Sequence, residues 1–320
     1  MKQRKIIKVG YKSFCPIVLE VFMIHINDIE VRYGEQIALR IITPIKIEEG
    51  DRVGIIGSNG AGKTTLINSM LGLVPYNGSI RTKVKPSEMS VHMQKNEYAG
   101  TVPIRYIIEA LLNTSIKKDK KLSELINFFN FKDCLNKKFN ALSGGEKQRL
   151  TIIMVLIQNT SLVFFDEVTT GLDFETRQQL MERIGTWYKK KNTTVLIVSH
   201  YYEELEQLVN KVMILEKGQI VAFGNKEELF NKYCGRSIIT VENNSYNNKI
   251  LKDYSKIFAP KHLLAFPLKE ENEEMGLIRL LIENNINFKR SNNDIEIMSI
   301  NAKMDFNSKK NGGNVREENL

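Results

Sequence analysis

Gly57-Ser58-Asn59-Gly60-Ala61-Gly62-Lys63-Thr64-Thr65 is the stretch of sequence that decides the fold of this chain. It follows an apolar run at residues 52–56 and opens a segment, residues 63–71, whose apolar positions recur at helical spacing. A Gly-x-x-x-x-Gly-Lys-Thr loop between a strand and a helix is typical of phosphate binding. Glycines let successive N–H groups approach phosphate oxygens, and the helix N-terminus adds a positive dipole end. We expect Lys63 to reach the β and γ phosphates of a nucleotide and the Thr64 hydroxyl to bind Mg²⁺.

A second apolar run ends in two carboxylates. Residues 162–165 read Leu-Val-Phe-Phe and are followed by Asp166 and Glu167. Ligands of a parallel sheet lie at the carboxyl ends of its strands. We therefore expect Asp166 to hold Mg²⁺, directly or through water, and Glu167 to polarise a water that attacks the γ-phosphate. Such a pair also occurs at solvated edges and helix caps, and the phosphate loop is what favours the catalytic interpretation.

A third motif, Leu142-Ser143-Gly144-Gly145-Glu146-Lys147-Gln148-Arg149, opens a predicted helix. Ser143 is expected to be the N-cap, and the glycines leave the helix N-terminus open to another anion. Ser-Gly-Gly-Glu alone is equally consistent with a simple helix cap. The whole octad, however, resembles the signature motif of ABC ATPases, and it lies between the other two motifs as that family requires.

The resemblance covers about residues 24–232 and implies roles for further residues. Gln94 resembles the Q-loop glutamine that contacts Mg²⁺ and senses the membrane partner, and His200 matches the switch histidine that contacts the γ-phosphate. The stretch from Thr169 to Asp173 is similar to the D-loop, and Tyr33 resembles the aromatic residue that stacks on adenine. Two residues depart from the family pattern: Val168 replaces a proline, and Thr170 replaces a serine.

The motifs and the resemblance together define the expected site. The catalytic residues are Lys63, Glu167 and His200, and Mg²⁺ is held by Thr64, Gln94 and Asp166. The expected nucleotide contacts are Tyr33, Gly57, Ser58, Asn59, Gly60, Ala61, Gly62, Lys63, Thr64, Thr65, Gln94, Ser143, Gly144, Gly145, Glu146 and Asp173.

Helical segments that alternate with apolar strands predict an α/β fold with right-handed crossovers and a mostly parallel sheet. The resemblance implies a P-loop NTPase domain of the ABC ATPase type over residues 23–232. It would contain a mixed, mostly parallel core sheet, an antiparallel β subdomain and a small helical subdomain at about residues 95–145. Residues 233–301 are expected to be a small accessory region, with a helix at 276–285 and a strand at 294–299. The polar residues 302–320 are expected to be disordered.

Composition places few limits on function. The apolar fraction of 42% and the charged fraction of 26% suit an ordinary globular domain. The net charge of +9 is spread along the chain, so we interpret it as a compositional bias. Three widely spaced cysteines without a paired motif indicate a reducing compartment, and no apolar run is long enough to span a membrane. Residues 1–22 are expected to be an extension that is no signal peptide, with Met23 as the natural start.

The resemblance implies the ATP-binding and ATP-hydrolysing subunit of an ABC membrane transporter, similar to bacterial ABC-2-type exporter ATPases. Its implied partners are ATP, a second copy or a paralogous ATPase arranged head to tail, and a transmembrane permease. The permease would hold it at the cytoplasmic face of the membrane. No nucleic-acid partner is expected. The alternative is a soluble ABC ATPase of a non-transport system, such as scaffold assembly or regulation.

Overall fold

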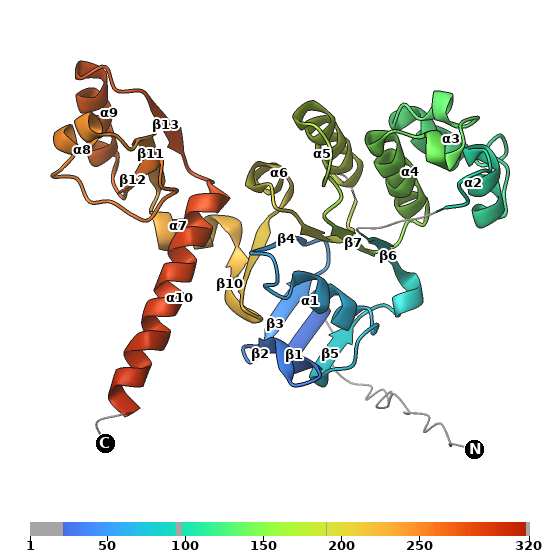
Figure 1. Ribbon diagram of the computed structural model, residues 1–320, viewed down its shortest axis with the longest axis horizontal. Helices are drawn as coiled ribbons and strands as arrows, with labels where there is room; N and C mark the ends of the chain where they lie inside the picture. The colour runs from blue at the N-terminus through green and yellow to red at the C-terminus, as the bar shows by residue number, and fades with distance from the viewer. Residues whose placement is uncertain (1–21, 94–97, 190, 318–320) are drawn as a thin grey trace.

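The computed structural model describes residues 22–93, 98–189 and 191–317 (Figure 1). A central α/β body lies between a helical part at one end and a C-terminal part at the other. Gln94 and most of the expected extension, residues 1–21, lie outside the described residues. The strand that begins at Phe22 therefore opens the described fold.

Six strands form the central sheet, in the order β10-β9-β4-β8-β7-β6. The strands are β4 (Arg52–Gly57), β6 (Met89–His92), β7 (Leu162–Asp166), β8 (Thr194–Val198), β9 (Lys211–Glu216) and β10 (Gln219–Asn225). All neighbours pair in parallel except β10, which returns antiparallel beside β9. The mixed, mostly parallel sheet expected from the sequence is therefore confirmed.

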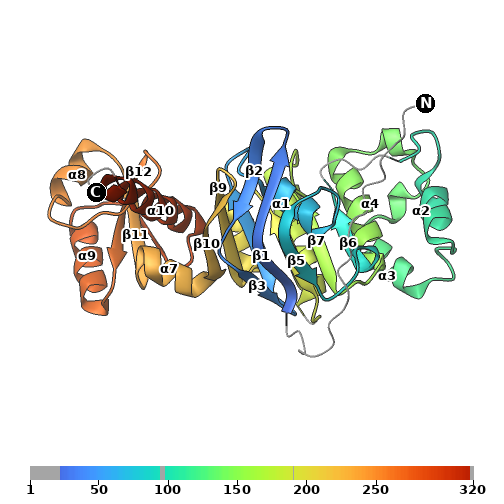
Figure 2. The same cartoon turned by 90° about the horizontal axis from the view of Figure 1, so that it is seen from below.

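A second sheet and one helix cover one face of the central sheet. The antiparallel strands are β1 (Phe22–Tyr33), β2 (Gln36–Ile41), β3 (Ile45–Glu48) and β5 (Asn77–Thr82), and the helix is α1 (Lys63–Met70). Figure 2 shows this layer in front of the central strands. Because side chains alternate along a strand, Leu162 and Phe164 of β7 point into this layer.

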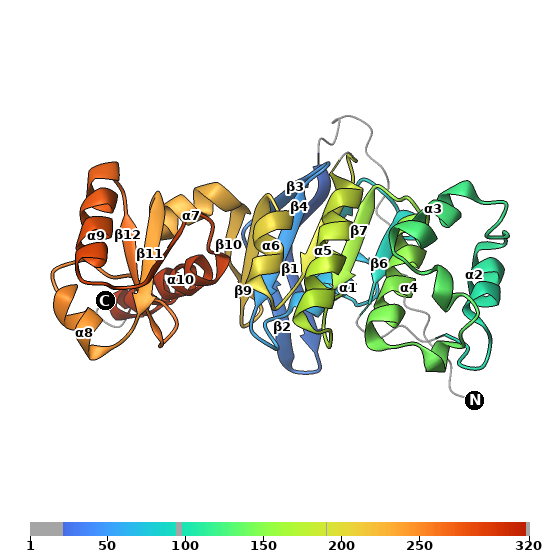
Figure 3. The ribbon, with the colours of Figure 1, turned by 90° about the horizontal axis from the view of Figure 1, so that it is seen from above.

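Helices cover the opposite face, toward which Val163 and Phe165 of β7 point (Figure 3). These helices are α4 (Gly144–Ile157), α5 (Phe174–Tyr188) and α6 (Tyr202–Leu208). The expected helical subdomain contains α2 (Ile104–Leu112) and α3 (Lys120–Phe128), with short 3₁₀ turns at Lys132–Cys134 and Phe139–Ala141. A further 3₁₀ turn, Pro86–Glu88, precedes β6.

The C-terminal part has a core of its own. After α7 (Lys226–Cys234) come β11 (Ser237–Glu242), α8 (Ser245–Ile250), β12 (Leu263–Leu268), α9 (Glu271–Glu283), β13 (Phe288–Ser291) and α10 (Ile295–Glu317). Its three strands form an antiparallel sheet in the order β12-β11-β13. Leu277 and Leu281 of α9 pack on this sheet, so the helix expected at residues 276–285 is present.

Two expectations for the end of the chain are wrong. Residues 294–299, expected as a strand, instead contain the start of α10 at Ile295, and the Asp294 carboxylate just before it accepts a hydrogen bond from the N–H of Ile297 (2.9 Å). Disorder is also contradicted for residues 302–317, because α10 continues to Glu317 and Ala302 is fully buried, while residues 318–320 lie outside the described residues. The buried apolar residues of this helix lie between Ile295 and Ala302, and the mostly polar composition beyond them conceals it.

None of the helices within the described ranges has the length and apolar character needed to cross a membrane.

Replacing Leu196 of β8 by alanine tests the core between the central sheet and the α1 layer. Leu196 is fully buried there, so Leu196→Ala should lower the free energy of unfolding by about 2–5 kcal/mol through lost burial and a residual cavity. Urea unfolding followed by circular dichroism measures the loss. Leu73→Ala is the matched control, because Leu73 is 64% exposed. Similar losses in both variants would contradict the placement of Leu196.

Candidate active site

The phosphate loop is held by close backbone contacts. A Cβ on Gly57 would lie 2.6 Å from the carbonyl oxygen of Leu215 in the neighbouring strand, so only glycine fits there. Gly60 (φ 76°) and Gly62 (φ 101°) have left-handed backbones, which glycine adopts without strain. Gly62 begins helix α1 without a side-chain cap. The first N–H groups of α1 therefore have no side-chain acceptor and can bind an anion.

Lys63 folds back over this loop. Its ammonium donates hydrogen bonds to the carbonyl oxygens of Gly57 (2.9 Å) and Ser58 (3.1 Å). Burial lowers the pKa of Lys63, while the carboxylates of Glu167 and Asp166 act in the opposite direction. The loop lysine and the acidic pair thus share one electrostatic environment.

Asp166 carries the features of a cation ligand. Its side chain is almost fully buried at the end of β7, and the Thr64 hydroxyl donates a hydrogen bond to Oδ2 (3.1 Å). Its Oδ1 is buried and has no hydrogen-bond partner among the described residues. Burial raises the pKa of Asp166, against the effect of the Thr64 hydrogen bond. A nearby cation would satisfy the free oxygen.

This donor set fits Mg²⁺. The described residues contain no group of three or more His, Cys, Asp or Glu side chains placed to hold a metal. Mg²⁺ suits a sparser site, because it commonly takes one or two protein ligands and fills its octahedron with water and phosphate oxygens. Thr64 and Asp166 would supply the protein oxygens of such a site.

Glu167 and His200 meet at the carboxyl edge of the sheet. They follow the adjacent strands β7 and β8, and Glu167 Oε1 lies 2.8 Å from His200 Nε2. Glu167 has a left-handed backbone (φ 52°), which is uncommon for a residue other than glycine. The turn is fixed because its N–H donates to the carbonyl of Val198 (3.0 Å). Strain of this kind is typical of functional sites.

Glu204 of α6, which the sequence did not single out, connects the loops on either side of this pair. Its carboxylate accepts hydrogen bonds from the hydroxyls of Thr169 (3.0 Å) and Ser199 (2.8 Å), and Arg177 Nε lies 3.7 Å away. Burial raises the pKa of Glu204, against the effect of these hydroxyls. No sequence pattern distinguishes Glu204, because Glu203 and Glu206 are neighbouring acids on the same short helix.

The signature segment forms a reciprocal helix cap. Ser143 Oγ accepts a hydrogen bond from the N–H of Glu146 (3.2 Å), and the Glu146 carboxylate accepts one from the N–H of Ser143 (2.8 Å). Ser143 is therefore the N-cap of α4, as expected. Glu146 also accepts hydrogen bonds from Lys137 (2.7 Å) and from the thiol of Cys134 (3.3 Å). Its carboxylate is engaged within its own subdomain.

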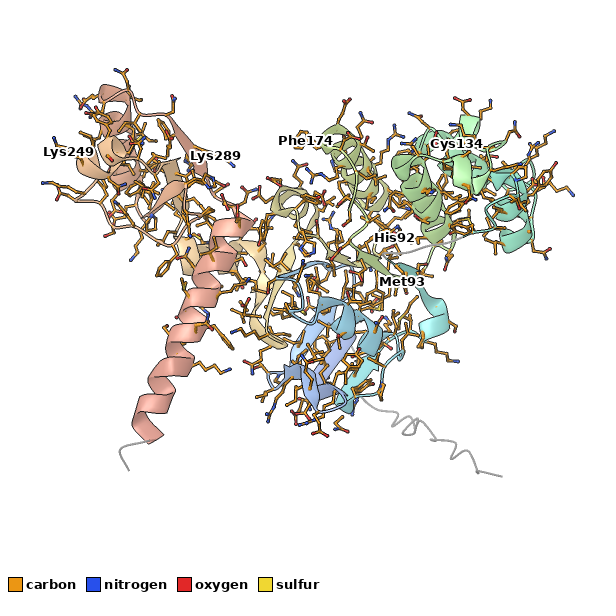
Figure 4. The ribbon with its side chains drawn as sticks, in the orientation of Figure 1. His92, Met93, Cys134, Phe174, Lys249 and Lys289 are labelled. Atoms are coloured by element: carbon orange, nitrogen blue, oxygen red, sulfur yellow. The ribbon has the colours of Figure 1, made fainter. Side chains whose placement is uncertain are left out.

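His92, which no sequence motif singles out, joins the sheet to the signature helix. On β6, its Nε2 lies 2.9 Å from Gln148 Oε1 and 3.0 Å from Thr151 Oγ1, both on α4. Figure 4 labels His92 beside Met93, at the strand end that leads to the expected Q-loop. Burial lowers the pKa of His92 to about 4, so the imidazole is neutral at neutral pH.

The remaining expected residues have varied surroundings. Tyr33 is 52% exposed at the end of β1, which leaves its ring accessible. Asp173 caps α5, and both of its carboxylate oxygens accept hydrogen bonds from Thr176. Gly145 lies against Thr176, where an added Cβ would be 3.1 Å from the threonine methyl group.

Glu146→Gln tests whether the ionised Glu146 carboxylate stabilises the cap of α4, because that stabilisation should depend on pH. Burial favours the neutral acid, but the hydrogen bonds from Lys137 and Ser143 prevail and lower the Glu146 pKa to about 2. Its stabilisation is therefore complete above the unfolded pKa and is lost as the pH falls toward 2. Glu146→Gln should cost about 1–3 kcal/mol of unfolding free energy at pH 7 and clearly less near pH 3.5.

Denaturant unfolding at the two pH values measures this difference. The control is Glu124→Gln on α3, where the side chain is 61% exposed. A loss for Glu146→Gln that does not change with pH would contradict the proposed origin of its stabilisation.

Glu204→Ala tests the connection between the two loops. It leaves two hydroxyls and the Arg177 cation without their carboxylate, so the thermal unfolding midpoint should fall by an amount equivalent to about 1–3 kcal/mol. Glu203→Ala, at an exposed position of α6, is the control. Differential scanning calorimetry measures the midpoints. If both variants unfolded at the same temperature as the unaltered chain, the proposed connection would be refuted.

Comparison with known proteins agrees with this geometry. Residues 43–170 match the family described as ABC transporter. The Nod factor export ATP-binding protein I of Rhizobium etli is 28% identical over 233 residues, which cover 68% of this chain and 73% of the relative. The high-affinity zinc uptake system ATP-binding protein ZnuC of Bacillus subtilis is 30% identical over 214 residues, which cover 62% of this chain and 92% of the relative.

Solved structures agree on the fold. That of cbiO1 from Clostridium perfringens, described as part of the ABC transporter complex cbiONQ, matches with a TM-score of 0.58. The match has 21% identity and covers 67% of this chain and 92% of that chain. The ABC ATPase fold expected from the sequence is confirmed by this likeness. From the matched family residues and the extent of the zinc-uptake relative that is covered, we conclude that the chain belongs to the ABC transporter family of ATP-binding proteins.

Proposed function

We propose that this chain binds and hydrolyses ATP as the nucleotide-binding subunit of a membrane transporter, in a head-to-tail pair with a second copy or a paralogous ATPase. The observation that carries the proposal is that three features of the site meet at the carboxyl ends of the central strands. The phosphate loop, the buried Asp166, and the Glu167–His200 pair converge there.

Binding begins with the triphosphate at the start of α1. The N–H groups of residues 57–65 surround the phosphates, and Lys63 exchanges the carbonyls of Gly57 and Ser58 for the β and γ phosphates. Thr64 and Asp166, with Gln94 as the third proposed ligand, would hold Mg²⁺. When bound, Mg²⁺ neutralises charge on the phosphates. The exposed ring of Tyr33 stacks on adenine.

Hydrolysis is assigned to Glu167. Its carboxylate orients a water in line with the γ-phosphorus and accepts the proton as the bond to the β-phosphate oxygen breaks. His200, 2.8 Å from Oε1, fixes the carboxylate and contacts the γ-phosphate once ATP is present. Glu204 accepts hydrogen bonds from Ser199, which precedes His200, and from Thr169 of the D-loop, and it thereby positions both loops.

The second half of each site comes from the facing subunit. Ser143, Gly144 and Gly145 present the N-terminus of α4 to the γ-phosphate of the partner's ATP. Glu146 supports this loop through its cap and its bond to Lys137, and we assign it a positioning role. The intact motifs allow two equivalent sites in a homodimer.

A transmembrane permease is the proposed partner of the helical subdomain. Tyr106 and Leu111 of α2 are 57% and 59% exposed, which provides apolar contact surface there. The relatives include one named for export and one named for uptake, so their names support a transporter subunit without favouring a direction. Export and a place at the cytoplasmic membrane face stay predictions.

Glu167→Gln tests the proposed chemistry. The variant should bind Mg·ATP but release phosphate at least about 100-fold more slowly, because it has lost the general base. It should also form an ATP-dependent dimer, detected by size-exclusion chromatography with light scattering. Glu182→Gln, at an exposed position of α5, is the matched control and should hydrolyse ATP at the unaltered rate.

Lys63→Ala completes the test, because it should abolish measurable ATP binding. Near-normal turnover by Glu167→Gln would contradict the role of Glu167. Tight ATP binding by Lys63→Ala would contradict the phosphate-loop assignment.

A further inference from the structure

Helix α10 extends from the C-terminal part to the β9–β10 hairpin. In Figure 1 it runs alongside β10, and two of its lysines contact residues on either side of the hairpin turn. Lys303 Nζ lies 3.1 Å from Glu216 Oε2, and Lys310 Nζ lies 3.4 Å from Gln219 Oε1. The turn between these two contacts consists of Lys217 and Gly218.

That turn supports the phosphate loop. The N–H of Gly218 donates to the carbonyl of Ala61 (3.0 Å), in the middle of the loop. On the other side, the carbonyl of Gly218 accepts a hydrogen bond from the N–H of Arg40 (2.7 Å). Gly218 has a φ of 77°, and a Cβ there would lie 2.7 Å from the carbonyl oxygen of Ala38. The turn therefore fits closely between β2 and the phosphate loop.

Helix α10 is itself well anchored. Ala302 is fully buried in the main core, and the N–H of Ile295 donates to Glu206 Oε1 of α6 (3.3 Å). Lys303 and Glu216 are 23% and 22% exposed, so their attraction is less screened than that of a fully exposed pair. Lys303 also affects the loop electrostatically. Burial is the main cause of the lowered pKa of Lys63, and the positive charge of Lys303 lowers it further.

We propose that α10 supports the phosphate loop from behind the β9–β10 turn, and that Lys303 is a positioning residue for this loop. Through its ion pair with Glu216, Lys303 holds the Lys217–Gly218 turn against Ala61. The C-terminal part thereby sets the affinity of the loop for phosphate. This inference rests on the proposed function, because it assumes that the loop binds ATP.

Nucleotide binding by the full chain provides the first test. Lys303→Gln should raise the Kd for Mg·ATP about threefold to fivefold, measured by isothermal titration calorimetry. The exchanged pair Lys303→Glu with Glu216→Lys should restore the affinity, whereas Lys303→Glu alone should weaken it. Lys309→Gln is the matched control, because Lys309 pairs with Asp305 within α10 and is 69% exposed.

Hydrogen exchange without nucleotide provides a second test that does not depend on ATP binding. The amide of Gly218 should exchange about threefold to fivefold faster in Lys303→Gln than in the unaltered chain or in Lys309→Gln. Unchanged Kd and unchanged exchange in Lys303→Gln would overturn the role of Lys303 alone. A weakened affinity that the exchanged pair does not restore would also overturn it. If the unaltered chain failed to bind ATP, the proposed function would fall, and this inference with it.

Discussion

The structure depends on how closely backbone packs around the phosphate loop. Gly57 lies against the carbonyl of Leu215, and Gly218 lies against that of Ala38, at separations that leave no space for a Cβ. A side chain at Gly57 would push the loop away from β9, and one at Gly218 would push the β9–β10 turn, which hydrogen-bonds to the loop at Ala61, away from β2. The N–H groups at the start of α1 would then move away from the proposed position of the phosphates. The geometry of the proposed anion site thus depends mainly on the spacing of the backbone segments around the loop, and less on side chains.

The charges of the site are arranged around that loop before any nucleotide is bound. Asp166 and Glu167 are neighbours in sequence, yet the left-handed turn at Glu167 gives them different surroundings. Asp166 is buried beside Thr64 with one free oxygen, whereas Glu167 faces His200. One acid can therefore hold a cation while the other remains available to a water. Two adjacent carboxylates can take these different roles because the backbone turn at Glu167 directs them into different surroundings.

The parts of the site that the sequence predicted are those encoded in short segments. The phosphate loop, the strand ending in Asp166 and the Ser143 cap are each encoded in consecutive residues, so local patterns were sufficient to predict them. Glu204 and Lys303 could not be predicted from local patterns, because their partners Thr169 and Glu216 lie 35 and 87 residues away in the chain. The helix at residues 302–317 could not be predicted for the same reason, since α10 is held by contacts with α6, α7 and β10. Tertiary packing overrode a composition that favours disorder.

The signature helix is tied to the sheet by His92 and to its own subdomain by Glu146, and neither group changes its charge near neutral pH. His92 has a pKa of about 4 and Glu146 one of about 2, so the first is neutral and the second ionised throughout the physiological range. Rotation of α4 away from β6 would leave His92, Gln148 and Thr151 without these bonds in a buried site, at a cost of about 1–3 kcal/mol for each unsatisfied group. Rotation of α4 against the sheet is therefore opposed at β6, which is itself paired in parallel with β7, so the position of the Ser143 loop is tied to the end of β6.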